Sequence, residues 1–197
     1  MVDPISEEEI RERFDMRMFL GACHRGFTLF GTGELNNPER REWVEKDDDS
    51  FHLVMEAEWS DRYRARKTID ELSDVTTGQL GERRAVITLT DLQAETELEM
   101  DADLVTDMRT GAAAAWGLKY LRPSHLRRLA IVGTGRVALR AALACDELFD
   151  IECIVVTSRN RENRERFAAQ ASSASARIEL APDIDRCVAD ADAIVLS

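Results

Sequence analysis

The sequence has few cysteines, and no two of them have the spacing of a metal site or a disulfide framework. The four cysteines, Cys23, Cys145, Cys153 and Cys187, are scattered, and no C-x-x-C pair occurs. Zinc sites and small disulfide-stapled folds both need paired cysteines. We therefore expect buried free thiols in a reducing compartment, and no metal site.

The sequence also lacks a long apolar run and an excess of positive charge. No stretch approaches the roughly 20 apolar residues that cross a bilayer. The first residues, MVDPISEEEIRERF, are acidic and have no apolar centre of the kind that secretory signals carry. A net charge of -12 repels the phosphates of nucleic acid and anionic lipid. We therefore expect a cytoplasmic protein that binds neither nucleic acid nor membranes.

The N-terminal part has the patterns of a small α+β domain. A hydroxyl cap at Ser6 and an acidic first turn predict a helix that runs to about Leu29. Residues 31–49 are rich in glycine, asparagine, proline and charge, which predicts a loop. The pair Gly31 and Gly33 lies in this loop after a helix, so it lacks the strand that a phosphate-binding turn needs.

Alternating apolar and polar residues predict an antiparallel sheet after this loop. Residues 51–57 and 85–92 are expected to be half-buried strands, with a third candidate strand between them and a hairpin return at 95–100. Asp103 then caps a long alanine-rich helix that ends before Pro123.

From residue 128 the pattern changes to alternating strands and helices. The apolar segment LAIV, a glycine turn, a helix and the segment IECIVV form a βαβ unit. Further strand and helix patterns follow up to the apolar segment AIVLS. The predicted fold class is α/β, a Rossmann-type parallel sheet preceded by a smaller α+β domain, with residues 1–121 in the first domain and 122–197 in the second.

The turn of this βαβ unit has the glycine pattern of a dinucleotide site. Gly133 allows a tight turn, Gly135 lets the backbone approach a diphosphate, and Ala138 permits close packing of helix on strand. The amides and dipole of the helix N-terminus then stabilise phosphate groups. The predicted cofactor-binding residues here are Gly133, Thr134, Gly135, Arg136 and Val137. The alternative is a turn whose small residues serve packing alone.

The end of the second strand lacks the carboxylate that holds the ribose hydroxyls in NAD-binding sites. The segment instead reads Thr157-Ser158-Arg159-Asn160. A carboxylate would repel a 2'-phosphate, whereas a hydroxyl and a guanidinium can bind it with charge-assisted hydrogen bonds. We therefore predict that Ser158, Arg159 and Asn160 contact the cofactor and that NADP(H) is preferred over NAD(H). The alternative is that Arg159 is a solvated loop charge.

Three segments together resemble the ornithine cyclodeaminase/mu-crystallin family. They are RRAVITLTDLQAETELEMDADLVTDMRTGAAAAWGLKYL, RRLAIVGTGRVALRAALAC and VVTSRNRENRERFAA. The most specific part, LVTDMRTGAAAA, is similar to the family's L-T-x-x-R-T-x-A helix start. The resemblance covers residues 50–197 and implies a nicotinamide-dependent enzyme. Such enzymes act on the carbon–nitrogen bond of a small amino or imino acid, as cyclodeaminases, alanine dehydrogenases and ketimine reductases do.

The resemblance also implies roles for residues that precede the glycine turn. Arg109 corresponds to the arginine that holds the substrate carboxylate, where a planar two-pronged donor suits a planar anion. Thr110, in the same motif, is assigned to the cofactor site. Lys67 matches the substrate-contacting lysine and is the candidate catalytic residue.

The match at Lys67 departs from the family pattern. The family usually has proline where this chain has Glu56, and Lys67 follows a basic cluster of Arg62, Arg64 and Arg66. The alternative that Lys67 is a solvated charge therefore stays open. Arg41 is the candidate match for an upstream substrate arginine, and we assign no role to it.

Relatives continue with further strands, a catalytic aspartate and a segment that returns to the first domain. Because none of these follows Ser197 in this sequence, the sheet is expected to be truncated, and whether the chain is a fragment stays open. On its own, the chain is expected to bind NADP(H) weakly and to show no turnover.

Two other classes of function also fit the pattern. One is a non-catalytic, crystallin-like protein that binds NADPH or a small ligand. The other is a dimerising interaction module, because the family's first-domain sheet pairs across a twofold axis. A homodimer is expected from the resemblance.

Overall fold

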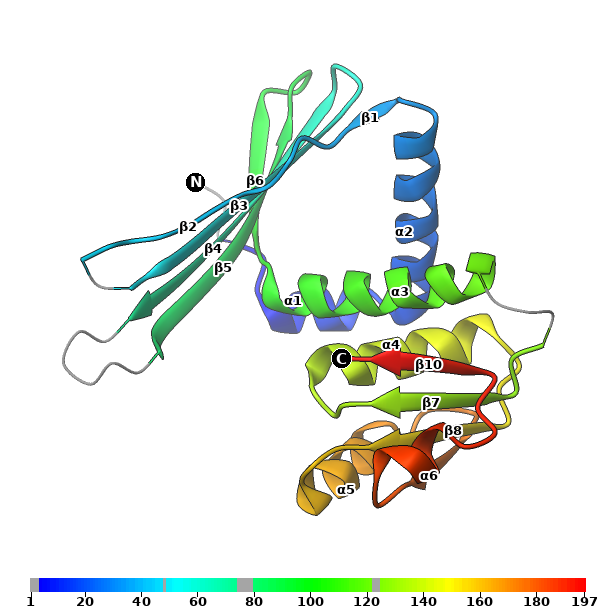
Figure 1. Cartoon of the computed structure of the whole chain (residues 1–197). Coiled ribbons are helices and arrows are strands. Elements are labelled where there is room, and N and C mark those ends of the chain that lie inside the picture. Colours follow the sequence, from blue (N-terminus) through cyan, green and yellow to red (C-terminus); the bar gives the residue numbers. More distant parts are fainter. Residues whose placement is uncertain (1–3, 48, 74–79, 122–124) are drawn as a thin grey trace. The chain divides into compact units, whose positions relative to one another are not determined.

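The computed structural model describes residues 4–47, 49–73, 80–121 and 125–197 (Figure 1). The chain forms two compact units, one made of Met1–Arg13 with Arg25–Val105 and the other of Phe14–His24 with Thr106–Ser197. This division passes through two helices, α2 (Met16–Gly31) and α3 (Asp103–Leu121), whereas the sequence predicts a boundary after residue 121.

The first helical region is two helices, α1 (Glu7–Arg13) and α2 (Met16–Gly31). The predicted capped start is confirmed, since Ser6 and Glu9 exchange hydrogen bonds between the amide of each and the side chain of the other. The prediction of one continuous helix to Leu29 is wrong. Asp15 interrupts it, because its carboxylate accepts the amide of Met18 at 2.9 Å and so caps a new helix.

The first unit contains an antiparallel sheet with the strand order β1-β3-β4-β5-β6, in which β2 also pairs with β3. Its strands are β1 (Leu35–Asn36), β2 (Arg41–Val44), β3 (Phe51–Trp59), β4 (Tyr63–Ser73), β5 (Leu80–Asp91) and β6 (Thr96–Asp101). The predicted antiparallel sheet is confirmed. The prediction of a loop over 31–49 is wrong where β1 and β2 pair with β3. All four residues of β2 are exposed, so that strand has no apolar alternation to detect.

The second unit contains a parallel sheet, as the sequence predicts for a Rossmann-type domain, and its strand order is β10-β7-β8-β9 (Figure 1). Its elements are β7 (Arg128–Val132), α4 (Arg136–Leu148), β8 (Cys153–Thr157), α5 (Arg161–Gln170), β9 (Arg177–Leu180), α6 (Ile184–Val188) and β10 (Ala193–Leu196). The strand order reverses direction at β7, which places a crevice at the carboxyl ends of the central strands.

The core of the second unit explains why the central strands β7 and β8 are nearly continuous apolar runs. Helices cover the sheet, and Ile131, Ile154, Val156 and Phe167 are almost completely buried. Cys145 on α4 lies in the same core, and its burial, helped by the carboxylate of Asp146, raises the pKa of its thiol to about 12. The sequence predicts buried cysteines, and Cys145, Cys153 and Cys187 are buried, whereas Cys23 is half-buried.

Helix α3 (Asp103–Leu121) approaches α4 very closely at one glycine. A Cβ atom built on Gly111 would lie 2.5 Å from the backbone carbon of Arg140. Real Cβ atoms do not approach a backbone atom so closely. The backbones of α3 and α4 therefore pack directly against each other at this point. The absence of a side chain at Gly111 therefore sets how near α3 lies to α4.

We predict that Gly111→Ala lowers the free energy of unfolding by about 1–3 kcal/mol, because the added methyl group forces α3 away from α4. The measurement is thermal or urea unfolding followed by circular dichroism. Gly117→Ala on the same helix is the matched control, since a Cβ there meets nothing within 4 Å. This control is expected to be neutral or stabilising by about 0.5–1 kcal/mol. Equal effects of the two substitutions would contradict the close approach.

Candidate functional site

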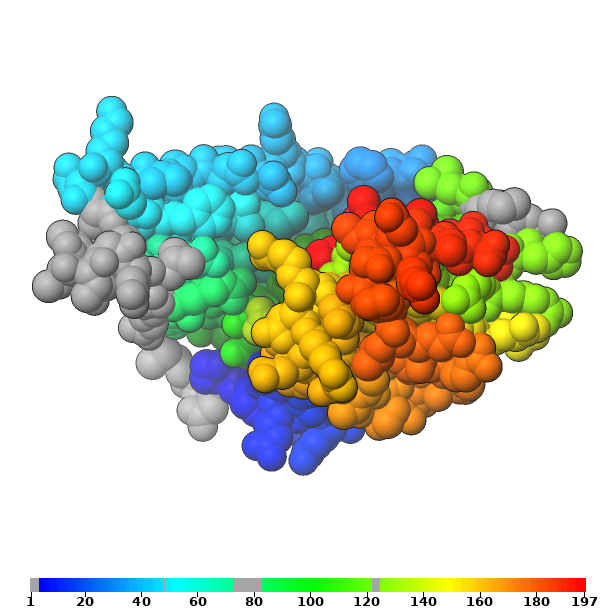
Figure 2. All heavy atoms as spheres, turned by 60° about the horizontal axis from the view of Figure 1, so that its bottom comes forward, coloured from blue at the N-terminus to red at the C-terminus, as the bar shows by residue number. Residues whose placement is uncertain are grey.

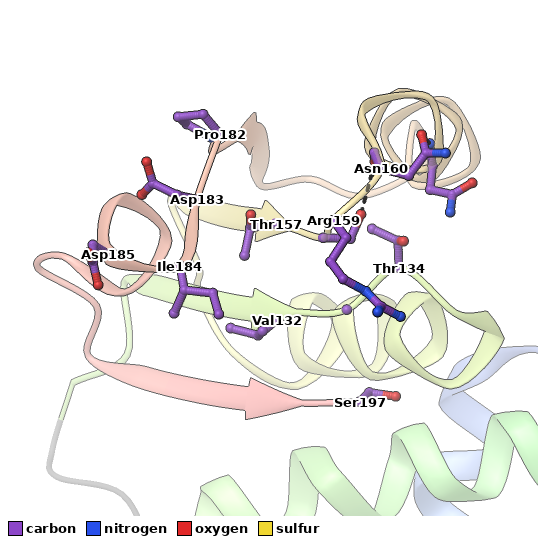
Figure 3. A pocket seen from close by; sticks show the side chains of 13 residues that line it. Val132, Thr134, Thr157, Arg159, Asn160, Pro182, Asp183, Ile184, Asp185 and Ser197 are labelled. Carbon is purple, nitrogen blue, oxygen red and sulfur yellow. Dashed lines mark hydrogen bonds between the residues drawn. The ribbon is translucent and has the colours of Figure 1, made fainter.

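A cleft of about 970 Å³ lies at the carboxyl ends of the strands in the second unit. Figure 2 shows the surface hollowed between the residues that begin α5 and those of α6. The residues that line the cleft come from the carboxyl ends of the strands and from the segments and helix starts that follow β7, β8 and β9. They are Val132, Gly133, Thr134, Thr157, Ser158, Arg159, Asn160, Asn163, Pro182, Asp183, Ile184, Asp185 and Ser197 (Figure 3).

Gly133 makes the tight turn that the sequence predicts for it. Its φ angle is +127°, a conformation that L side chains rarely adopt. Its amide donates a hydrogen bond to the carbonyl of Thr157 at 2.8 Å, which ties the turn to the end of β8. A Cβ on Gly133 would lie 1.8 Å from the carbonyl oxygen of Ser197. Only glycine fits here.

Position 135 does not require glycine for the reasons that apply at Gly133. It is the N-cap residue of α4, with an ordinary φ of -73°. A Cβ on Gly135 would meet nothing within 4 Å, so protein packing does not exclude a side chain there. The residue is exposed, and none of the side chains that the structure describes caps this helix start. Unshielded amides and the positive end of the helix dipole are the groups that bind a phosphate.

The rest of the turn is arranged as the dinucleotide pattern requires. Ala138 is completely buried beneath the turn, and Val137 is half-buried. Thr134 lines the cleft, and Arg136 is exposed and forms an ion pair with Asp107 of α3. The residues present thus fit a diphosphate, because the turn offers both space and unshielded donors.

Of the three residues predicted to contact the cofactor at the end of β8, Arg159 is the one that carries a charge, and its side chain faces the cleft. Arg159 is exposed, and within the part of the chain that the structure describes it makes no ion pair. Figure 3 shows its side chain extending from the end of β8 toward the glycine turn. A guanidinium in this place can bind an anionic group of a ligand.

Ser158 and Asn160 line the same cleft, but their side chains also build the turn. The hydroxyl of Ser158 donates to the carbonyl of Asn160 at 3.1 Å. The side-chain oxygen of Asn160 accepts the amide of Glu162 at 2.7 Å and so caps α5. The hydroxyl of Thr157 is buried and donates to the carbonyl of Ala181.

Sequence reasoning missed the residues that follow β9 and form the other wall of the cleft. Asp183 accepts the amide of Arg186 at 2.8 Å and caps α6. Ile184 is 58% exposed, which leaves an apolar surface in this wall of the cleft. The sequence contains a signal that could have predicted this wall. A helix cap directly follows the third strand of the parallel sheet, and the carboxyl ends of parallel strands lie at one edge of the sheet.

The motif on α3 lies outside the residues that line the cleft. Arg109 is exposed, and among the described residues it has no ion-pair partner. The hydroxyl of Thr110 donates to the carbonyl of Thr106 at 2.6 Å, within the helix. That bond commits the hydroxyl proton of Thr110 to the helix.

Lys67 lies in the first unit, in the middle of β4. It is directly opposite Met55 on β3 and Ile87 on β5, so the three side chains share one face of the sheet. The neighbouring rows on that face are also apolar, with Leu53, Ile69 and Ala85 on one side and Ala57, Ala65 and Leu89 on the other. Lys67 is half-buried among them.

The basic cluster before Lys67 lies on the opposite face of the sheet. Arg64 and Arg66 alternate with Lys67 along β4 and are exposed, and Arg64 pairs with Glu58 at 2.7 Å. Lys67 is therefore separated from the solvated charges that precede it. Arg41 on β2 pairs with Glu56 at 3.3 Å on an exposed strand.

The structure contains neither a metal cluster nor a membrane-spanning helix in its described residues. No group of three or more histidine, cysteine or acidic side chains among them could hold a metal ion. Likewise, none of the described helices combines the length and apolar character needed to cross a bilayer.

Comparison with known proteins identifies relatives of the whole chain and of its parts. The model of the ornithine cyclodeaminase/mu-crystallin family matches residues 3–197. The ketimine reductase mu-crystallin of Rattus norvegicus is 31% identical over 96 residues, which are 49% of this chain and 30% of that protein. The L-lysine cyclodeaminase of Streptomyces rapamycinicus is 31% identical over 94 residues, which are 48% of this chain and 27% of that protein.

The fold is shared with solved structures over almost the whole chain. The Delta(1)-pyrroline-2-carboxylate reductase of Thermococcus litoralis, solved with NADH and L-proline, superposes with a TM-score of 0.86 at 23% identity. The match covers 99% of this chain and 61% of that chain. This likeness shows the fold, and the chain spans about three-fifths of that structure.

We predict that Gly135→Ala weakens nucleotide binding without destabilising the fold. A methyl group there meets no protein atom within 4 Å but occupies the space over the helix amides where a phosphate would lie. We expect the Kd for NADPH, measured by fluorescence titration, to rise about tenfold or more, corresponding to the loss of a charge-assisted hydrogen bond.

Gly133→Ala is the comparison variant for this experiment. Because of its positive φ and its contact with Ser197, this substitution is expected to lower thermal stability as well as nucleotide affinity. Unchanged NADPH binding by Gly135→Ala would argue that the turn serves packing alone.

Proposed function

The chain belongs to the ornithine cyclodeaminase/mu-crystallin family, and from this premise we propose that it binds NADP(H) and belongs to an enzyme acting on the carbon–nitrogen bond of a small amino or imino acid. The observation that carries the proposal is the uncapped start of α4, reached through Gly133 and Gly135 at the edge of a 970 Å³ cleft. Ketimine reductase, alanine dehydrogenase and cyclodeaminase activities all belong to this class of reaction.

The geometry of the cleft supports nucleotide binding. The amides at the start of α4 hold the diphosphate, and Thr134 lies beside it. The adenosine half extends toward the ends of β8 and β9, where Ile184 offers an apolar surface to a base. This orientation agrees with the position of the cleft at the carboxyl edge of the parallel sheet.

The preference for NADP(H) rests on Arg159. At the end of β8 this exposed guanidinium stands where a carboxylate would select NAD(H), and the described residues supply it with no ion-pair partner. An arginine can bind a 2'-phosphate through two parallel N–H donors.

The substrate is held by groups that precede the glycine turn. Arg109 binds the carboxylate of the amino or imino acid, for which its planar guanidinium is suited. Lys67 donates a hydrogen bond to the substrate from the otherwise apolar face of its sheet. When bound, the nicotinamide supplies or accepts the hydride, and the chain contributes orientation and charge.

The homodimer expected from the family resemblance is part of the proposal. Trp43 and Val44 on β2 are 45% and 55% exposed, and both are large apolar side chains. A second copy of the chain would remove them from water.

We predict that Arg159→Gln selectively weakens NADPH binding. Loss of the charge-assisted bonds to the 2'-phosphate should raise the Kd for NADPH about tenfold or more while leaving that for NADH unchanged. Both values are obtained by fluorescence titration. The matched control is Arg161→Gln, since Arg161 is also exposed but already pairs with Glu165 at 2.7 Å. A wild-type preference for NADH, or equal losses for both nucleotides, would contradict the assignment.

We predict that Arg109→Ala abolishes substrate binding but leaves NADPH affinity intact. The probe is the change in fluorescence of bound NADPH on addition of Delta(1)-pyrroline-2-carboxylate or L-proline, which reports binding without requiring turnover. Arg109→Lys keeps the charge but loses the two-pronged geometry, so it should recover only part of the affinity. If the Arg109→Ala variant is saturated by either compound at the same concentration as the wild-type protein, the arginine has no role in holding the carboxylate.

A further inference from the structure

An ion pair joins the substrate-motif helix α3 to the first residue of α4. The guanidinium Nε of Arg136 lies 3.1 Å from a carboxylate oxygen of Asp107. The two partners differ in their surroundings, because the side chain of Asp107 is 9% exposed and that of Arg136 is 64% exposed. The acid is thus fixed inside the unit, whereas the base extends into solvent.

Neither residue is required by the motif in which it stands. Asp107 occupies an open position of T-x-x-R-T, and Arg136 occupies an open position of G-x-G-x-x-A. A carboxylate is costly to bury unless it is paired. Each motif leaves its position open, and in this chain the two positions carry opposite charges that meet in the folded protein.

The placement of Arg136 gives the pair a consequence for ligand binding. Arg136 begins α4, directly after exposed Gly135 and the turn that lines the cleft. A guanidinium bonded through Nε has its rotation restricted, because the planar group is held along the edge that carries Nε. Restricting a long side chain before a ligand arrives lowers the entropy lost on binding.

We propose that Asp107 is a positioning residue, which holds Arg136 beside the glycine turn so that its guanidinium binds the diphosphate of the cofactor. This inference rests on the proposed nucleotide function and deepens it. The diphosphate is then held by a side-chain cation as well as by backbone amides. Because Asp107 lies two residues before Arg109 on α3, the same helix that carries the substrate arginine also orders the diphosphate clamp.

Two nearly isosteric substitutions and their combination test the proposal. The variants are Asp107→Asn, Arg136→Gln and the double variant, and the probes are NADPH, ADP-ribose and adenosine 2'-monophosphate. ADP-ribose contains the diphosphate, whereas adenosine 2'-monophosphate lacks it. Circular dichroism and thermal unfolding establish that each variant is folded.

We expect Arg136→Gln to raise the Kd for NADPH and for ADP-ribose about tenfold, and Asp107→Asn to raise both about threefold to tenfold. Neither variant should change the affinity for adenosine 2'-monophosphate. The double variant should bind no worse than Arg136→Gln alone, because Asp107 acts only through the arginine. Arg17→Gln is the matched control, since Arg17 pairs with Glu147 in the last turn of α4 and should leave all three affinities unchanged.

Three outcomes would overturn the inference. If Asp107→Asn and Arg136→Gln bind ADP-ribose as the wild type does, the pair only ties α3 to α4. If their effects add in the double variant, or extend to adenosine 2'-monophosphate, Asp107 acts on the fold and not through Arg136. Failure of the wild-type protein to bind any nucleotide would remove the proposed function itself and the clamp with it.

Discussion

The organisation of the second unit depends on one unshielded helix end. Within the described parts of the chain, the backbone amides at the start of α4 have no side-chain cap, and the turn that leads to them carries no bulky side chain. Unpaired amides at a helix start are stabilised by water or by an anion. The parallel sheet places this helix start at the edge where all its strands end, and so the remaining residues of the cleft gather around it.

Close packing beneath the turn keeps this helix end in place. Ala138 is fully buried against the sheet, and Gly111 lets α3 meet the backbone of α4 without an intervening side chain. The alanine-rich middle of α3 therefore has a packing purpose as well as a high helix propensity. Through this approach the segment that carries Arg109 is positioned by the same helix that presents the turn.

Positive and negative groups lie at different walls of the cleft. The net charge is -12, yet the groups at the turn are a helix dipole and two exposed guanidinium groups, those of Arg136 and Arg159. Acidic side chains occur at the other wall, where Asp183 caps α6. This separation favours a ligand whose phosphates lie near the glycine turn and whose uncharged base lies near Ile184.

The sequence by itself determined those features whose cause is local. The glycine turn follows from backbone geometry at Gly133 and Gly135, and the parallel strands follow from unbroken apolar runs that can only be buried on both faces. The capped starts at Ser6 and Asn160 depend on residues within one turn of the helix. The family motif on α3 can also be recognised from the sequence, since its residues are contiguous.

Tertiary structure decided what depends on residues far apart in the chain. The exposed strand β2 exists because β3 offers it hydrogen bonds, and no periodicity in its own residues predicts that pairing. Strand pairing places Lys67 on the apolar face, away from the arginines beside it in sequence. The pairing of Asp107 with Arg136 and the wall formed after β9 likewise arise only on folding, because a sequence pattern records spacing along the chain and not distance in space.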